Sequence, residues 1–244
     1  MNEIVEGFIQ AVQLIATLNP EVMGIALLSI TISLSATALA SLYSIPLGAL
    51  IYYYDFYGKR VVVNLIQTLY ALPTVIAGLF LFLFLSNQGP FGSLHLLFTP
   101  QGMIIAQMTL VTPLIMGLTI SALSGIDKEM RFSILSLGAT KGQVVLTLIQ
   151  EARFAILAAV ILGFGRAISE VGAAMIIGGN IRAPIGYPFD GTRVLTTAIS
   201  LQTSQGDFAF AIALGIILLG IAVIVNIILN LVQSGPIGAD TMAS

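Results

Sequence analysis

Residues 22–51 read VMGIALLSITISLSATALASLYSIPLGALI, and no charged side chain interrupts the run between Glu21 and Asp55. A helix needs about 20 mostly apolar residues to cross a hydrocarbon core about 30 Å thick, because lipid offers the backbone no hydrogen-bond partners. This stretch is long enough and apolar enough. It therefore predicts a membrane-spanning helix and decides the class of the protein.

The rest of the chain repeats this pattern. Hydrophobic residues make up 57% of the 244 residues and charged residues 8%, against roughly 25% charged residues in an average soluble domain. Further apolar stretches of spanning length occupy residues 61–85, 103–123, 154–177 and 208–232. We therefore expect an all-α integral membrane protein with about five transmembrane helices, in one domain covering residues 21–232.

The two ends of the chain differ from this domain. Residues 4–18 place apolar side chains at helical spacing, which predicts an interfacial helix within residues 1–20. Glu3 and Glu6 stand where a secretory leader would carry positive charge, so we expect no cleaved signal. Residues 233–244 are expected to form a short tail.

Composition excludes several kinds of site. The chain has no cysteine and a single histidine, His95, without a carboxylate cluster near it in sequence, so we expect no catalytic residues and no metal site. The net charge of −2 and the lack of a basic cluster argue against a nucleic-acid partner.

Basic residues are distributed unequally between the connections. The connections after the first and third stretches carry Lys59, Arg60, Lys128, Arg131, Lys141 and Arg153, whereas the opposite side carries Arg182 and Arg193. Positively charged loops stay in the cytoplasm, which places the N-terminus outside and the C-terminus inside. The aromatic run at residues 52–57, beside Lys59 and Arg60, suits a belt at the inner interface, or only a sticky turn.

The connection at residues 126–153, IDKEMRFSILSLGATKGQVVLTLIQEAR, is charged at both ends and apolar between them. Gly138 and Gly142 favour a break between two short helices. The apolar side chains need cover from water, namely Leu135, Leu137, Val144, Val145, Leu148 and Ile149. A groove in a partner protein and the lipid headgroups are both consistent with this pattern.

A resemblance separates these two possibilities. Ser136, Leu137, Gly138, Ala139 and Thr140, followed by Lys141 and an apolar run, resemble the cytoplasmic coupling loop of type I ABC importer permeases. The resemblance implies the fold of that family, a second copy of the chain, two ABC ATPase subunits that hold ATP and Mg²⁺, and an external binding protein. Residues 132–134 replace the Glu-Ala-Ala that usually opens the motif, and its closing proline is missing.

Other segments are similar to the molybdate and tungstate branch of that family. They are residues 71–78 (ALPTVIAG), 89–100 (GPFGSLHLLFTP) and 166–181 (RAISEVGAAMIIGGNI). Within this branch, residues 192–199 and 206–208 resemble the tungstate permeases most. Relative to those permeases, residues 183–190 are an insertion. The resemblance implies an importer for tungstate or molybdate in the plasma or inner membrane.

Arg166 and Glu170 are the ionisable pair inside the fourth stretch. Residues four apart on a helix share a face and can form an ion pair. Ionisable groups at this depth usually face protein or water, so the pair either lies beside a translocation pathway or locks two helices together. An ion-coupled secondary transporter, with this pair as its coupling site, is the alternative function.

The outer connection offers Asn180, Arg182 and Arg193. The two arginines suit an oxyanion or acidic residues of a binding protein, although solvated loop charges are the simpler explanation. The chain has no Gly-x4-Gly-Lys-Ser/Thr motif, so we expect ATP hydrolysis in a partner and not here. A membrane-embedded enzyme, the third class considered, lacks a nucleophile with a partnered base.

Overall fold

The computed structural model describes residues 2–184 and 186–233, and for residues 2–4, 128 and 188 only the backbone. Apart from Gln233, the expected tail at residues 233–244 lies outside the described residues. The described chain is helical and contains no β-strand. Its α-helices are α1 Asn2–Ala16, α2 Pro20–Tyr53, α3 Lys59–Thr68, α4 Thr74–Leu85, α5 Pro100–Ser124, α6 Lys128–Ser136, α7 Lys141–Glu151, α8 Arg153–Ile168, α9 Gly172–Gly178, α10 Leu195–Gln205 and α11 Phe208–Gln233; its 3-10 turns are η1 Leu69–Ala71, η2 Gly92–Leu94 and η3 Pro188–Asp190.

Three of the described helices, α2, α5 and α11, are each long and apolar enough to cross a membrane. The count rises to five if the bent pairs α3–α4 and α7–α8 each count as one span. The predictions for residues 22–51, 103–123 and 208–232 are therefore confirmed as helices. Pro46 and Pro113 lie inside α2 and α5, which continue through them.

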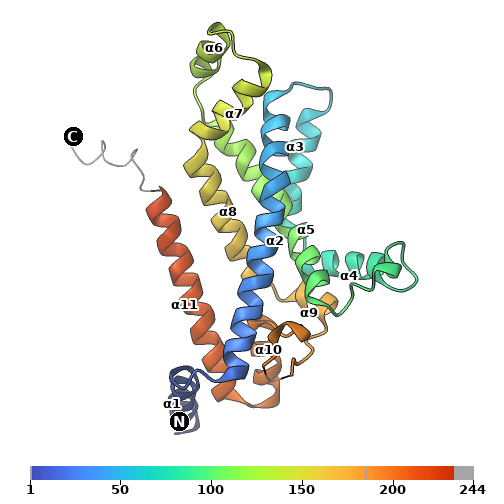
Figure 1. Ribbon diagram of the computed structural model, residues 1–244, viewed down its shortest axis with the longest axis vertical. Coiled ribbons are helices and arrows are strands. Elements are labelled where there is room, and N and C mark those ends of the chain that lie inside the picture. Colours follow the sequence, from blue (N-terminus) through green and yellow to red (C-terminus); the bar gives the residue numbers. More distant parts are fainter. Residues whose placement is uncertain (1, 185, 234–244) are drawn as a thin grey trace, which may run out of the picture.

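The helix pair α2 and α5 forms the centre of the molecule (Figure 1). Asn19 starts α2 by accepting hydrogen bonds from the N–H groups of Glu21 and Val22 through its side chain. Close approach of the two helices depends on Gly48, where a Cβ would stand 2.9 Å from the carbonyl oxygen of Met116. Small residues allow such contacts between membrane helices.

The second and fourth predicted spans are both broken helices. The α3 and α4 axes differ by 103°, and α4 runs across the direction of the other long helices (Figure 1). Pro73 separates them, because proline lacks an N–H donor and pushes the preceding Leu72 out of the helical region, to φ −59° and ψ 124°. The fourth span ends at Ile168 and resumes at Gly172 as α9.

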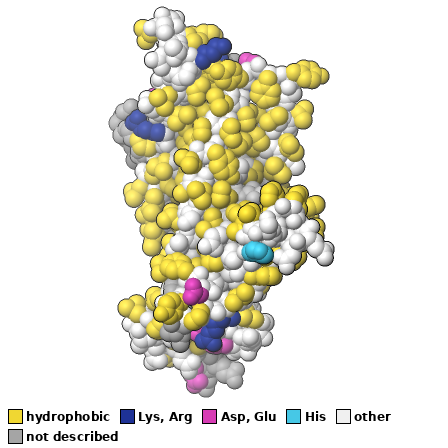
Figure 2. Space-filling model, turned by 45° about the vertical axis from the view of Figure 1, so that its right-hand side comes forward, with side chains coloured by type: hydrophobic (Ala, Val, Ile, Leu, Met, Phe, Trp, Pro, Cys, Tyr) yellow, Lys and Arg dark blue, Asp and Glu magenta, His cyan; other side chains and the backbone are white. Residues whose placement is uncertain are grey.

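The long axis of the molecule has two distinct ends (Figure 1). The helices α6 and α7 lie at one end, beside the end of α2, and α1 and α10 lie at the other. Between the two ends, one face shows a wide belt of hydrophobic side chains, with Lys and Arg side chains toward the ends (Figure 2). Such a belt is what a bilayer requires.

The helices α1 and α10 complete the second end. Ala11 of α1 is buried, and a Cβ on Gly7 would contact the side chain of Ile212 in α11 at 3.7 Å. The sequence did not predict α10, because its many Thr, Ser and Gln residues leave no clear apolar pattern. In the structure, its Leu195 and Ala198 are buried against α2 and α11. A position of α1 at the membrane interface stays a prediction.

Candidate functional site

The connection between α5 and α8 forms two short helices with a sharp turn between them. Asp127 caps α6 by accepting from the N–H of Glu129, and Thr140 and Gln143 form a reciprocal capping box at the start of α7. Gly138 lies in the turn with φ +81°, a conformation that costs side-chain-bearing residues free energy. The predicted break is confirmed at Gly138, whereas Gly142 lies inside α7.

The chain itself covers part of the apolar face of this connection. Val144 and Leu148 of α7 are buried against Tyr53, Leu123 and Ile156. The prediction that the whole face needs external cover is therefore wrong for α7. The apolar side chains left exposed are mainly those of α6 and the turn, namely Phe132, Leu135 and Leu137, the last 88% exposed, together with Leu146 on the other face of α7.

Two cations fasten this connection to the end of α2. The guanidinium of Arg131 lies 4.7 Å from the ring centre of Tyr53 and donates to the Tyr53 carbonyl at 3.5 Å. The ammonium of Lys141 lies 5.9 Å from the ring centre of Tyr54. A cation above the face of an aromatic ring is attracted by the negative face of the ring, which stabilises the contact. Part of the predicted aromatic belt thus anchors the turn that presents Leu137.

A second candidate site lies between the break that precedes α4 and the break that precedes α9. Both breaks lie part-way along the length of α2 (Figure 1). A cavity of about 470 Å³ is lined by both breaks. Its polar lining comes from Tyr70, Thr74, Arg166, Ser169 and Glu170. Tyr70 and Thr74 were not predicted as site residues from the sequence.

Arg166 and Glu170 share this cavity but do not form an ion pair, so that prediction was wrong. The reason is that α8 ends at Ile168, which removes Glu170 from the helix face of Arg166. Glu170 is 5% exposed, and its carboxylate accepts from the N–H of Ala173 at 3.0 Å, in the first turn of α9. Its carbonyl accepts from the hydroxyl of Thr196 at 2.7 Å. Glu170 therefore fastens α9 and α10.

Arg166 is the exposed member of the pair. No described residue forms an ion pair with its guanidinium or accepts a hydrogen bond from it. The alternative of a neutralised pair that locks two helices thus finds no support in the geometry. An unpaired guanidinium inside a membrane domain must face water or protein.

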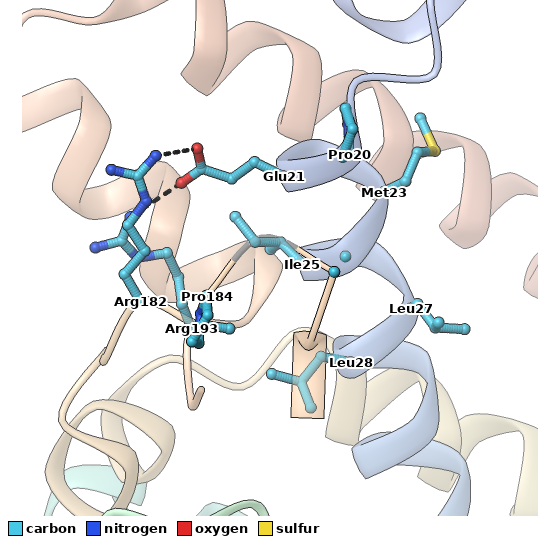
Figure 3. Close-up of a pocket in the computed structure, with 12 residues that line it drawn as sticks. Pro20, Glu21, Met23, Ile25, Leu27, Leu28, Arg182, Pro184 and Arg193 are labelled. Carbon is cyan, nitrogen blue, oxygen red and sulfur yellow. Dashed lines mark hydrogen bonds and ion pairs between the residues drawn. The ribbon is translucent and has the colours of Figure 1, made fainter. Parts of the chain in front are cut away.

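The connection after α9 brings Arg182 and Arg193 together at one acidic residue, Glu21, which was not among the site residues predicted from the sequence (Figure 3). Glu21, at the start of α2, accepts from Arg182 at 2.5 Å and stands 3.7 Å from Arg193. The side chain of Arg193 is only 14% exposed, so it is not a solvated loop charge. Burial lowers the pKa of Arg193, while Glu21 acts in the opposite direction.

Asn180 has a separate position. Its side chain accepts from the Thr197 hydroxyl at 3.0 Å and donates to the Thr197 carbonyl at 3.4 Å. Asn180 itself has φ +54°, a conformation that asparagine tolerates better than most residues. In this structure Asn180 therefore holds the connection onto α10, and a docking role for it stays a prediction.

The sequence matches one family model across most of its length. The family of binding-protein-dependent transport system inner membrane components matches residues 44–236, which include the α6–α7 turn and both helix breaks. The chain belongs to this family. As a member, the permease is a multi-pass membrane protein, as predicted.

Relatives of the permease agree in length as well as in sequence. It is 42% identical to the tungstate uptake system permease protein TupB of Peptoclostridium acidaminophilum, over 96% of this chain and 99% of that one. It is 36% identical to the TupB protein of Campylobacter jejuni, over 93% and 92%, and 38% identical to a probable anion ABC transporter permease protein of Haloferax volcanii, over 84% and 87%.

The fold of the permease is similar to a solved transporter. A chain in the crystal structure of a bacterial alginate ABC transporter, in complex with an alginate pentasaccharide-bound periplasmic protein, superposes with a TM-score of 0.60. The match covers 87% of the permease and 79% of that chain at 18% identity. The predicted type I permease fold is confirmed, and nothing in the comparisons supports the secondary-transporter alternative.

Proposed function

We propose that this permease is the membrane subunit of an ATP-driven importer whose substrate is the tungstate oxyanion. Its two TupB relatives are tungstate uptake permeases, and they match nearly the whole chain. The Haloferax volcanii relative is described as an anion permease, which agrees in substrate class. A homodimer with two ATPase subunits and one external binding protein is the assembly that we propose.

The observation that carries this proposal is the exposed turn between α6 and α7. Leu137 projects there from a turn that capping bonds and cation–aromatic contacts hold in place, while Val144 and Leu148 of α7 are already covered by their own chain. A fixed, projecting apolar side chain suits insertion into a groove on an ATPase subunit better than burial in headgroups. ATP and Mg²⁺ belong to that subunit, and movement of the turn transmits nucleotide-driven closure to the membrane helices.

The cavity at the two helix breaks supplies the proposed pathway. Arg166 lines it without a partner, so the face that carries Arg166 meets a second copy or the water between two copies, and not lipid. A guanidinium in such a passage attracts an anion and repels cations. Glu170, held by Ala173 and Thr196, shapes the passage and contributes less to contact with the anion.

The proposed orientation follows from the ends of the molecule. The α6–α7 end faces the cytoplasm and the ATPase, and the end that carries α1, α10 and the Glu21 cluster faces outward, toward the binding protein. This puts the N-terminus outside and the end of α11 inside, in agreement with the distribution of basic loop residues.

The direct test is co-purification of the permease with candidate ATPase subunits. The Leu137→Asp change should abolish ATPase capture, because a carboxylate would have to enter an apolar groove. Tyr57→Asp, at the same end and fully exposed but on another connection, is the matched control and should leave capture intact. Equal capture by the native and Leu137→Asp proteins would overturn the coupling assignment.

A further inference from the structure

A cavity of about 260 Å³ lies between the first turns of α2 and the connection after α9 (Figure 3). Three of its lining residues are charged, namely Glu21, Arg182 and Arg193. The others are apolar or glycine: Pro20, Met23, Gly24, Ile25, Leu27, Leu28, Ala183, Pro184 and Gly186. The charged residues gather on one side, and Leu27 and Leu28 lie farther along α2 (Figure 3).

The charges of this cavity do not balance. One carboxylate faces two guanidiniums, and its shorter contact goes to Arg182, the more exposed of the two. Arg193 is more deeply buried, yet its nearest carboxylate oxygen is 3.7 Å away, and its Nε atom is buried without an acceptor among the described residues. Buried donors and charges are costly unless they find partners. The cavity therefore has an excess positive charge and an unmet need for an acceptor.

The apolar wall determines which kind of anion suits the cavity. Glu21 and Leu28 are seven positions apart on α2, so the wall extends about 10 Å along the helix from the charged side. Leu27, at the open side, is 49% exposed. A small inorganic anion would lose water beside this hydrocarbon surface without replacing it. An amphiphile satisfies both parts, because its anionic head meets the arginines and its chain covers α2.

We infer that this cavity binds an anionic phospholipid of the adjoining leaflet. Its phosphate lies at Arg193 and Arg182, and one acyl chain covers the exposed Leu27, whereas Ile25 and Leu28 form the protein-covered floor of the cavity. Glu21 keeps the guanidiniums in place and leaves one positive charge for the lipid. This assignment needs a bilayer at that end of α2, but it depends on neither the ATPase nor the transported oxyanion.

The first experiment uses the full-length permease purified in an uncharged detergent. Phosphatidylglycerol, phosphatidylcholine with the same chains, and glycerol 3-phosphate are added separately. Bound lipid is counted by native mass spectrometry, and the midpoint of thermal unfolding is measured. We expect phosphatidylglycerol to be retained and to raise the midpoint, phosphatidylcholine to do so less, and glycerol 3-phosphate to have no effect. Equal effects of the two lipids, or an equal effect of glycerol 3-phosphate, would overturn the inference.

Variants then locate the site. Arg193→Gln should weaken phosphatidylglycerol retention about tenfold or more, since it removes charge-assisted hydrogen bonds to the phosphate. Arg60→Gln removes an exposed arginine at the opposite end and should retain the lipid as the native protein does. An equal loss in the two variants would mean unspecific attraction by charge and would overturn the inference.

A second pair tests the apolar wall without altering any charge. Leu27→Gln should weaken lipid retention, because it makes the open side of the wall polar. Leu34→Gln is the matched control, since Leu34 is also exposed and lies two turns farther along the same face of α2, outside the cavity. If both changes act equally, or if a cross-link from Leu27→Cys joins two copies in a bilayer, the lipid assignment is wrong.

Discussion

The phenol oxygen of Tyr70 lies directly against the Cα atom of Gly117, so that a Cβ built on Gly117 would stand 1.5 Å from it. Tyr70 lines the cavity at the two helix breaks, and Gly117 lies on α5 behind it. The absence of a side chain at residue 117 therefore decides where Tyr70 stands and how wide the cavity is.

Gly117→Ala is expected to impair transport more than stability. The alanine methyl group must displace the rigid ring of Tyr70, whose Cζ atom would be 2.5 Å away, and overpacking of this kind costs about 1–3 kcal/mol. Tungstate uptake by the reconstituted transporter and the unfolding midpoint are the measurements. Gly220→Ala on α11, with no atom within 4 Å, is the control. Full uptake in Gly117→Ala would count against a role for Tyr70.

Gly138→Ala and Gly142→Ala should act in opposite directions. Neither position has an atom within 4 Å of a built Cβ, but only Gly138 has a positive φ. Alanine at residue 138 should cost about 1–2 kcal/mol locally, whereas alanine at residue 142 should favour α7 by up to about 1 kcal/mol. Hydrogen exchange of the α6 and α7 amides and ATPase capture test both. Equal protection in the two variants would contradict the turn geometry.

Ser29→Ala should destabilise the junction between α2 and α10. The Ser29 hydroxyl accepts from the buried N–H of Leu195 at 2.8 Å, and loss of a buried acceptor costs about 1–3 kcal/mol. Ser44→Ala is a sharp control, because Ser44 is equally buried on α2 but its hydroxyl has no described partner. The unfolding midpoint should fall for Ser29→Ala and stay or rise for Ser44→Ala.

Arg166→Ala should reduce oxyanion uptake much more than Arg182→Ala does. Arg166 lines the proposed pathway without a partner, whereas Arg182 is mostly exposed and pairs with Glu21 at one end of the molecule. Uptake in proteoliposomes containing ATPase and binding protein is compared at equal permease content. Equal, full uptake in Arg166→Ala would exclude Arg166 from the pathway.

The sequence predicted those parts of the fold that depend on local composition. The apolar length of residues 22–51 predicts α2, and Gly138 predicts the break between α6 and α7, because a missing side chain is the direct cause of that turn. Pro46, Pro73 and Pro113 all lie inside predicted spans, yet only Pro73 divides its helix, whereas α2 and α5 continue through Pro46 and Pro113. The local effect of a proline is the same in each case, and the surrounding contacts differ.

Hydrophobic length and the backbone preferences of neighbouring residues were enough to show a membrane protein with a helical connection that presents Leu137. The partners of the ionisable groups, by contrast, are set by how the helices pack. Glu21 meets Arg182 across 161 positions of sequence, and Glu170 turns to Ala173 and away from Arg166. Such pairings depend on where distant helices end and meet, and no local pattern records that.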